Sequence, residues 1–361
     1  MNTTAPPFAF IQSHGACRGA LDRADHLRND ADALNALWPQ ARVVLLDATG
    51  CALADHDGRL STPTGSLLSE GPGGVGAAVF LGLDDAGVGW FSLESALSSF
   101  DAPGRIDLRS AAAQWPMFDA SVFAQARALQ HWRSRHRYCG VCGGEVALAR
   151  GGWQGACVEC AAQHYPRTDP AVIMAVSDGS RLLLGRQSTW PARRYSALAG
   201  FVEPGESLEQ TVAREVMEET GVRVRSCHYL ASQPWPFPGA LMLGFIADAD
   251  ADEPQVGDEL EDARWFTVDE IRAAKAREAD AHAPGQLDKD KPDRDKPDPD
   301  DPGSEPTALG KAALGKTDAN TGEHGAPHDD GGPLLSSPMS IARWLIEQWL
   351  TAAEGPPPRQ P

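Results

Sequence analysis

The chain has 361 residues and a formal net charge of −18 at pH 7, from 32 basic and 50 acidic side chains. Its length allows a sizeable core and two or more domains, whereas its acidic balance argues against a broad nucleic-acid-binding surface. No apolar run approaches the roughly 18 residues of a membrane span, and the first residues lack the charged and apolar regions of a secretion signal.

Seven cysteines fit a reducing compartment. Four of them have the spacing of metal ligands, and the other three, Cys17, Cys51 and Cys227, are scattered along the chain. A disulfide framework is therefore not expected. Together with the absence of a secretion signal, this predicts a cytoplasmic protein.

Residues 1–131 alternate short apolar stretches with Gly and Asp turns, as in ARVVLLDATG (41–50), GAAVFLGLD (76–84) and VGWFSLES (88–95). The segment DASVFAQARALQHWRSRH (119–136) has helical spacing and good helix formers. The pattern predicts a small mixed α/β domain over residues 1–131.

Two CxxC pairs mark a compact module over residues 132–168. Cys139 and Cys142 are followed, after 14 residues, by Cys157 and Cys160, which is the spacing of a four-thiolate zinc ribbon. Four protein ligands leave no open position for water, so we expect one structural Zn²⁺ per chain. A redox dithiol is the alternative, and two pairs at this distance make it the weaker one.

Residues 169–279 are predicted to form the next domain, beginning with a hairpin around Asp178 and Gly179. A helix follows Gly200, and then come strands at ALMLGFIADAD (240–250) and DARWF (262–266). Residues 280–332 are rich in Pro, Asp, Lys and Gly, which predicts a disordered insertion, with an acidic interaction tail as the alternative. Residues 333–354 return to an amphipathic helix, for which Ser340 is a candidate cap.

The stretch GFVEPGESLEQTVAREVMEETGV (200–222) holds six glutamates and a single basic residue, Arg214. Like charges one helical turn apart repel each other, so a cation should lie among Glu215, Glu218 and Glu219. Carboxylates on a helix that follows a Gly- and Pro-containing loop suit Mg²⁺ or Mn²⁺, which bridge oxygen ligands to substrate phosphates. A solvated acidic face, the alternative, would leave the repulsion unexplained.

The same stretch resembles the Nudix box, G-x5-E-x7-R-E-U-x-E-E-x-G-U with U an aliphatic residue. Every fixed position matches: Gly200, Glu206, Arg214, Glu215, Val216, Glu218, Glu219, Gly221 and Val222. Further segments are similar to the NADH pyrophosphatase family within the Nudix superfamily: the cysteine module, HYPRTDPAVI (164–173), SQPWPFP (232–238) and EDARWF (261–266). The resemblance implies a Nudix α/β/α sandwich with a zinc ribbon and a Nudix-like α/β N-terminal domain.

The resemblance also implies roles for residues of the box. Glu206 and Arg214 would form a salt bridge that braces the loop against the helix. The catalytic metal would be held by Glu215, Glu218 and Glu219, by Glu259 from outside the helix (with Asp258 as a second candidate), and by the carbonyl of Ala199. The same three helix glutamates are the candidate catalytic residues. Glu219 is preferred as the base, although coupled carboxylates titrate as a group, which leaves the choice open.

Substrate contacts are implied at Tyr165, at Phe201, across the loop at Gln233, Pro234, Trp235, Pro236, Phe237, Pro238, Gly239 and Ala240, at Ala342 and at Arg109. The prolines would stiffen this loop, and the rings of Trp235 and Phe237 could stack on a nicotinamide or adenine. As structure alone, the two rings would be core or turn residues. The family loop commonly ends in serine where this chain has Ala240, and the insertion is foreign to the family pattern.

The implied reaction is metal-dependent hydrolysis of the pyrophosphate of NADH or NAD⁺ to NMN(H) and AMP. The family also suggests removal of NAD caps from RNA 5′ ends and a homodimer. The rival hypotheses are a Nudix hydrolase of another dinucleotide, such as ADP-ribose or a diadenosine polyphosphate, and a non-enzymatic nucleotide-binding regulator. SQPWPFP argues against the first rival, and the complete set of box carboxylates argues against the second.

Overall fold

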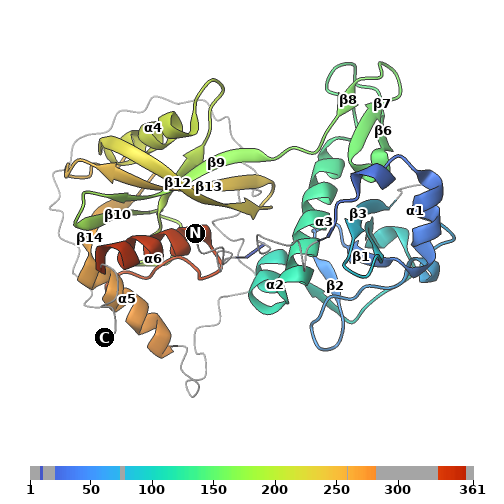
Figure 1. Ribbon diagram of the computed structural model, residues 1–361, viewed down its shortest axis with the longest axis horizontal. Helices are drawn as coiled ribbons and strands as arrows, with labels where there is room; N and C mark the ends of the chain where they lie inside the picture. Colours follow the sequence, from blue (N-terminus) through green and yellow to red (C-terminus); the bar gives the residue numbers. More distant parts are fainter. Residues whose placement is uncertain (1–8, 11–20, 74–77, 258, 282–331, 355–361) are drawn as a thin grey trace, which may run out of the picture. The chain divides into compact units, whose positions relative to one another are not determined.

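A computed structural model describes residues 9–10, 21–73, 78–257, 259–281 and 332–354 (Figure 1). The chain divides into two compact units. Unit 1 contains Met1–Ala171, Ala231–Leu243 and Pro338–Trp344, and unit 2 contains Val172–Leu230, Gly244–Ser337 and Leu345–Pro361. Residues 282–331, on which the predicted disordered insertion falls, lie outside the described residues, as does Asp258.

Unit 1 contains a five-stranded sheet of order β3-β4-β1-β2-β5. Strand β1 runs parallel to β4, and the other neighbours are antiparallel. This mixed sheet and its helices agree with the α/β pattern of the N-terminal sequence. The bounds are β1 Arg42–Leu46, β2 Ala52–Ala54, β3 Val79–Leu83, β4 Gly89–Glu94, β5 Gly104–Ile106, α1 Ala31–Leu37, α2 Leu108–Gln114 and α3 Met117–Arg135.

Helix α3 lies in the core of unit 1. Its buried side chains recur at helical spacing and include Phe123, Leu129 and Trp132. Phe123 and Leu129 belong to a core cluster with strand residues such as Val44 and Leu81. The helix predicted over residues 119–136 is therefore present, and its apolar face packs inward.

The cysteine module, also in unit 1, is a small three-stranded antiparallel sheet. Its strands are β6 Val146–Ala149, β7 Gln154–Cys157 and β8 Gln163–His164. One CxxC pair lies before β6, and the other lies at the end of β7 and in the turn that follows it. The sheet therefore provides the frame on which the two pairs face each other.

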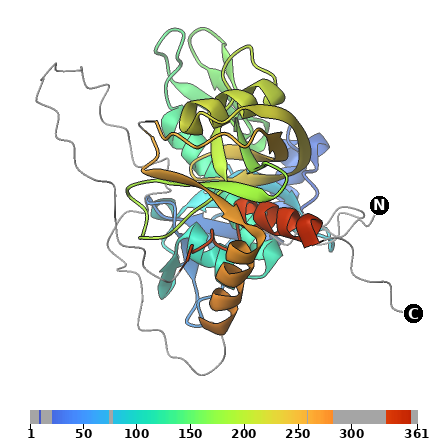
Figure 2. The same ribbon diagram turned by 90° about the vertical axis from the view of Figure 1, so that its left-hand side faces the viewer.

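The second large sheet has the order β12-β13-β9-β10-β14, with β11 paired to β9. Figures 1 and 2 show helix α4 on one side of this sheet and helices α5 and α6 on the other, an α/β/α sandwich. The tip of the β12–β13 hairpin, Ala231–Leu243, is grouped with unit 1. The bounds are β9 Asp169–Ser177, β10 Arg181–Arg186, β11 Leu198–Phe201, α4 Leu208–Thr220, β12 Val224–Trp235, β13 Ala240–Ala249, β14 Asp262–Thr267, α5 Val268–Ala281 and α6 Ile341–Glu354.

Local sequence explains the ends of these elements. The predicted hairpin joins β9 to β10 through Gly179, whose positive φ of 103° suits glycine. Helix α6 begins at the predicted cap, because the Ser340 hydroxyl accepts a hydrogen bond from the Arg343 amide at 3.3 Å. Among the described residues, no helix is long and apolar enough to cross a membrane.

Candidate active site and zinc ribbon

The box glutamates lie on and just before α4, a helix whose two ends are fixed by its own sequence. Ser207 and Gln210 form a reciprocal capping box at the first turn. At the other end Gly221 adopts the left-handed conformation, with φ 68°, and its amide bonds to the Met217 carbonyl. The caps fix where the helix starts and ends, and hence which faces carry Glu215, Glu218 and Glu219.

Arg214 is the cation that gathers the carboxylates in unit 2. Its guanidinium pairs with Glu206 at 2.6 Å and also bonds to Glu215 at 2.9 Å and Glu218 at 3.0 Å. A further N–H donates to the Phe201 carbonyl at 2.9 Å. The brace expected between loop and helix is thus present as an ion pair, and the links to Glu215 and Glu218 go beyond it.

Further contacts hold Glu206, the loop residue of this ion pair, in place. The Arg214 guanidinium lowers the pKa of the Glu206 carboxyl to about 2, together with the Glu203 amide. The Thr211 hydroxyl donates to the same carboxylate at 2.9 Å. Glu206 therefore remains ionised at any working pH and acts as a fixed structural anion.

Glu219 differs from Glu215 and Glu218, because among the described residues no cationic side chain forms an ion pair with it. Its side chain is buried, and its Oε2 atom has no hydrogen-bond partner among the described residues. Burial, and then the charges of Glu215 and Glu259, raise the pKa of its carboxyl to about 8. A buried carboxylate that lacks a partner is a strong candidate for a metal ligand or a general base.

Gly200 makes room for this group of carboxylates. A Cβ atom at position 200 would overlap the Glu215 carboxylate, so a larger residue in β11 would push this carboxylate out of its observed place. Burial raises the pKa of the Glu215 carboxyl, and Arg214 acts against this rise. The box glycine is therefore needed for a close approach at the candidate site.

The other predicted metal ligands are also in unit 2. Ala199 and Phe201 flank Gly200 in β11, with the Phe201 side chain exposed. Glu259 lies close enough to act electrostatically on both Glu215 and Glu219. Their oxygen chemistry and the unpartnered Glu219 oxygen fit a hard divalent cation, although within the described ranges only the cysteine set has its ligand atoms within 4.8 Å of one another.

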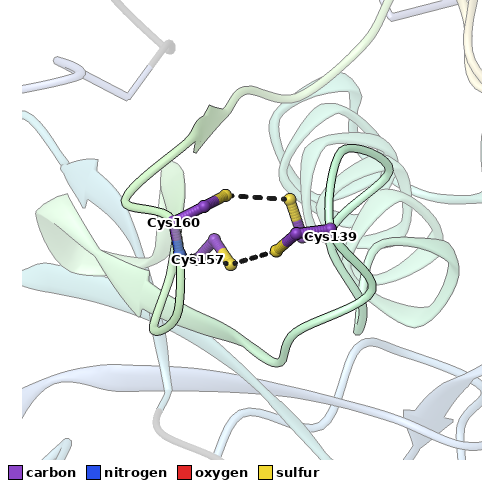
Figure 3. Close-up of side chains that lie close together, drawn as sticks. Cys139, Cys157 and Cys160 are labelled. Atoms are coloured by element: carbon purple, nitrogen blue, oxygen red, sulfur yellow. Dashed lines mark hydrogen bonds between the residues drawn. The ribbon is translucent and has the colours of Figure 1, made fainter.

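The four cysteines of the ribbon converge tightly. Figure 3 shows Cys139, Cys157 and Cys160 with their sulfur atoms turned toward a common centre. The Sγ atoms of Cys139 and Cys160 are 3.7 Å apart, and those of Cys142 and Cys157 are 3.4 Å apart. Tetrahedral Zn²⁺ with Zn–S bonds of about 2.3 Å needs sulfur atoms roughly 3.8 Å apart. The cysteines therefore fit zinc.

Two backbone amides lie close to sulfur atoms of this cysteine cluster. The amides of Val141 and Cys160 approach the Sγ atoms of Cys139 and Cys157 at 3.4 and 3.5 Å. The Cys160 amide is the main cause that lowers the pKa of the Cys157 thiol to about 7. Thiolates are the form that binds zinc, so this amide favours the ligand state of Cys157.

The SQPWPFP loop, residues 232–238, lies at the tip of the β12–β13 hairpin and belongs to unit 1. We predicted that it presents two aromatic faces, and this is wrong for Phe237, which is 4% exposed and packs in the core cluster of unit 1. Trp235 is partly buried and meets Phe237 edge to face, with ring centroids 5.0 Å apart. Only Trp235 retains surface for stacking.

Arg109, predicted as a substrate contact, lies beside this loop. Its guanidinium is 4.3 Å from the Phe237 ring and 5.5 Å from the Trp235 ring. A cavity of about 540 Å³ adjoins the loop and is lined by Trp235, Pro236 and Ala240, by α3 and by Trp153 of the ribbon. Its size and aromatic walls suit a small heterocycle. Tyr165, also in unit 1, is exposed.

Gln233, Ala240 and Ala342 are buried in unit 1. The Gln233 side chain is fully buried, and its amide bonds to backbone groups of residues 9, 339 and 341. No sequence pattern indicates these bonds, because their partners are backbone atoms distant along the chain. The substrate contacts assigned to these three residues stay predictions.

Two family matches cover the parts just described. Residues 167–285 match the NUDIX domain, and residues 134–165 match the NADH pyrophosphatase zinc ribbon domain. A Nudix hydrolase domain therefore follows a structural zinc ribbon in this chain, as the sequence predicted.

Curated relatives extend the similarity beyond these two domains. The chain is 41% identical over 266 residues to an NAD-capped RNA hydrolase NudC of Mycobacterium bovis, covering 72% of this chain and 84% of the relative. It is 47% identical over 160 residues to the NudC of Stutzerimonas stutzeri, covering 44% and 58%. A solved Nudix hydrolase of Nitrosomonas europaea shares 28% identity over 36% of this chain and 77% of that one, with a TM-score of 0.33. The chain belongs to the NudC family of Nudix hydrolases.

Proposed function

We propose that this enzyme hydrolyses the pyrophosphate of NADH or NAD⁺ to NMN(H) and AMP, and that it removes NAD caps from RNA 5′ ends. The observation that carries the proposal is the combination, in one chain, of the complete carboxylate helix with the SQPWPFP loop. Relatives at 41% and 47% identity are named NAD-capped RNA hydrolases, which supports the same substrate class.

In the proposed reaction, water attacks one phosphorus of the diphosphate and the bond to the bridging oxygen breaks. Glu219 is the preferred acceptor of the water's proton, because a base works best when its pKa lies near the operating pH, and burial raises the pKa of this carboxyl to about 8. Glu215, Glu218, Glu219, Glu259 and the Ala199 carbonyl would hold Mg²⁺ or Mn²⁺. When bound, the cation neutralises diphosphate charge.

On the substrate side, Trp235 and the cavity beside it would receive one ring of the dinucleotide. Tyr165, Phe201, Arg109 and Ala342 remain proposed contacts, as do the loop residues Pro234, Pro236, Pro238 and Gly239. The family commonly has serine where this chain has Ala240. Ala240 has no hydroxyl group, so it can make only van der Waals contacts with a substrate.

We also propose that the enzyme works in the cytoplasm as a homodimer. The family resemblance supports the dimer, and the free cysteines Cys51 and Cys227 fit a reducing compartment. Light scattering of the purified protein at working concentration measures the oligomeric state, and a mass equal to one chain would contradict the dimer.

A substrate panel tests the central proposal. Purified protein with Mg²⁺ or Mn²⁺ is incubated separately with NADH, NAD⁺, ADP-ribose and NAD-capped RNA, and the products are identified by mass. The expected result is NMN(H) and AMP from the first two, and a 5′-monophosphate end on the RNA. Turnover of ADP-ribose without turnover of NADH would refute the proposed substrate, and no turnover of any of the four would favour a binding protein.

A further inference from the structure

We propose that Gln233 is a positioning residue. Its buried side-chain amide fastens the start of α6 and the segment around Ala9 to the SQPWPFP loop, and it sets the loop's position without touching substrate itself. The inference rests on the proposed function only for its kinetic test, because the contacts that carry it involve no substrate.

The Gln233 amide bonds to three backbone groups within unit 1. Its Nε2 group donates to the Ala9 carbonyl at 3.0 Å and to the Met339 carbonyl at 2.9 Å. Its Oε1 atom accepts from the Ile341 amide at 2.8 Å. The Ala9 amide also donates to the Met339 carbonyl at 3.0 Å, so three separate segments meet at one side chain.

The chemistry of these partners fixes which way the amide points. A side-chain amide has two N–H donors and one carbonyl acceptor. Two partners of Gln233 are carbonyl oxygens and one is an N–H group, so the reverse orientation would face oxygen with oxygen and N–H with N–H. Both donors are used in the observed orientation. No donor remains for a diphosphate or a ribose.

The burial of the Gln233 side chain raises the cost of losing any of these hydrogen bonds. Gln233 is 0% exposed, so water cannot replace a bond that is lost, and an unpaired buried backbone group is costly. The bonds join residues separated by 224, 106 and 108 positions along the chain. Gln233 is therefore the point at which both terminal parts of the described chain are attached to the hairpin tip.

The attached groups border the proposed substrate contacts directly. Ile341 is the first residue of α6, and Ala342 is the second. Pro234 and Trp235, which follow Gln233 in β12, line the cavity. Phe10, which follows Ala9, also lines it and lies 6.2 Å from the Phe237 ring. Loosening Gln233 would therefore shift two parts of the cavity wall together with the start of α6.

The test compares Gln233→Met, which keeps the length but removes all three bonds, with Gln130→Glu as the matched control. Gln130 is a partly buried glutamine of unit 1 whose side chain donates a single bond, to the Asp47 carbonyl at 3.0 Å. Hydrogen exchange is measured without substrate on peptides covering residues 339–345. We expect exchange of the Ile341 amide to rise about tenfold or more in Gln233→Met, in line with the loss of a buried hydrogen bond, and to stay unchanged in the control.

NADH kinetics provide the second readout. Gln233→Met should raise KM about tenfold while kcat changes only a few-fold, because the loop positions substrate and the carboxylates of α4 are untouched. A raised KM with unchanged exchange at Ile341 would mean that Gln233 contacts substrate directly and would overturn the proposal. So would normal KM and normal exchange.

The variant could fail to fold, or the wild-type enzyme could fail to hydrolyse NADH, and each case has its own test. If Gln233→Met does not fold, Gln233→Asn keeps the amide but shortens its reach by one methylene, and the same exchange at Ile341 decides the question. If the wild-type enzyme does not hydrolyse NADH, the proposed function fails, whereas the exchange comparison still supports or refutes the attachment.

Discussion

The zinc ribbon and the proposed cation site on α4 are built in opposite ways. The ribbon cysteines bring all their ligand atoms within 4.8 Å before any ion is considered, and they offer no open position. On α4, by contrast, Arg214 occupies Glu215 and Glu218 while Glu219 stays buried and unpaired. A closed, preassembled site suits a metal that stabilises the fold. A partly neutralised, unfinished site suits a cation that arrives with substrate.

The largest expected effect concerns the unpaired member of the open site. Glu219→Gln keeps the shape but removes charge and basicity, so NADH hydrolysis should fall by a factor on the order of 10² or more. Folding should be unchanged. The control is Glu209→Gln, an exposed glutamate in the first turn of the same helix, which should retain activity. Activity of Glu219→Gln within a few-fold of wild type would remove Glu219 from the mechanism.

For the zinc ribbon, the effect of a substitution should appear in the stability of the fold. Cys157→Ser removes one of four zinc ligands, so zinc content and melting temperature should fall together, because structural zinc contributes folding free energy directly. Cys227→Ser, at a partly buried cysteine outside the ribbon, is the control and should keep both. Elemental analysis and thermal unfolding measure the two quantities. Full zinc content in Cys157→Ser would contradict the four-thiolate site.

A smaller effect should appear in the pH dependence of the open site. Glu219 has an ordinary pKa of 4.5, which the fold raises to about 8. Between these values the folded protein holds the proton more tightly than the unfolded chain, so rising pH removes stability when no divalent cation is added. A cation favours the ionised carboxylate and should reverse this loss.

The stabilisation by added Mg²⁺ should therefore grow from about pH 5 to about pH 8, with roughly 2–4 °C in melting temperature for each kcal/mol. Differential scanning calorimetry with and without Mg²⁺ measures it. Glu219→Gln should abolish the growth with pH. A constant difference in the wild type would show that Glu219 does not titrate in this range.

The smallest effect is expected from the insertion. Deleting residues 285–331 and joining the ends with a short Gly/Ser linker should change melting temperature and NADH turnover little, because the removed residues are polar and poor in core formers. Gly332 and Pro333 should be kept, since their carbonyls accept bonds from Arg193 at 2.8 Å and Arg277 at 3.2 Å. A large loss of activity with an intact fold would make the segment a functional lid.

Much of the fold, the zinc ribbon and the capped carboxylate helix could be predicted because the determinants are local. The four cysteines, the hairpin at Gly179 and the box from Gly200 to Val222 are continuous patterns in which spacing alone fixes the neighbours. The links from Arg214 to Glu215 and Glu218 follow from the same local spacing along α4 and could have been anticipated.

Other features depend on partners that spacing does not reveal. Phe237 lies within a proline-rich signature, yet it packs against Phe10, which is far away in sequence. The partners of Gln233 are backbone atoms of residues whose side chains carry no pattern. Such contacts emerge only once the chain has folded.

The residue allowed at position 200 depends on the residue at position 215. Because any side chain at position 200 would occupy the space of the Glu215 carboxylate, a substitution at position 200 would displace that carboxylate from its observed place. In a descendant that no longer needed the carboxylate, replacement of Glu215 by a smaller residue would release this constraint first. Side chains larger than glycine at position 200 would then accumulate. Their presence in a homologous chain would indicate that the carboxylate at position 215 is displaced or lost.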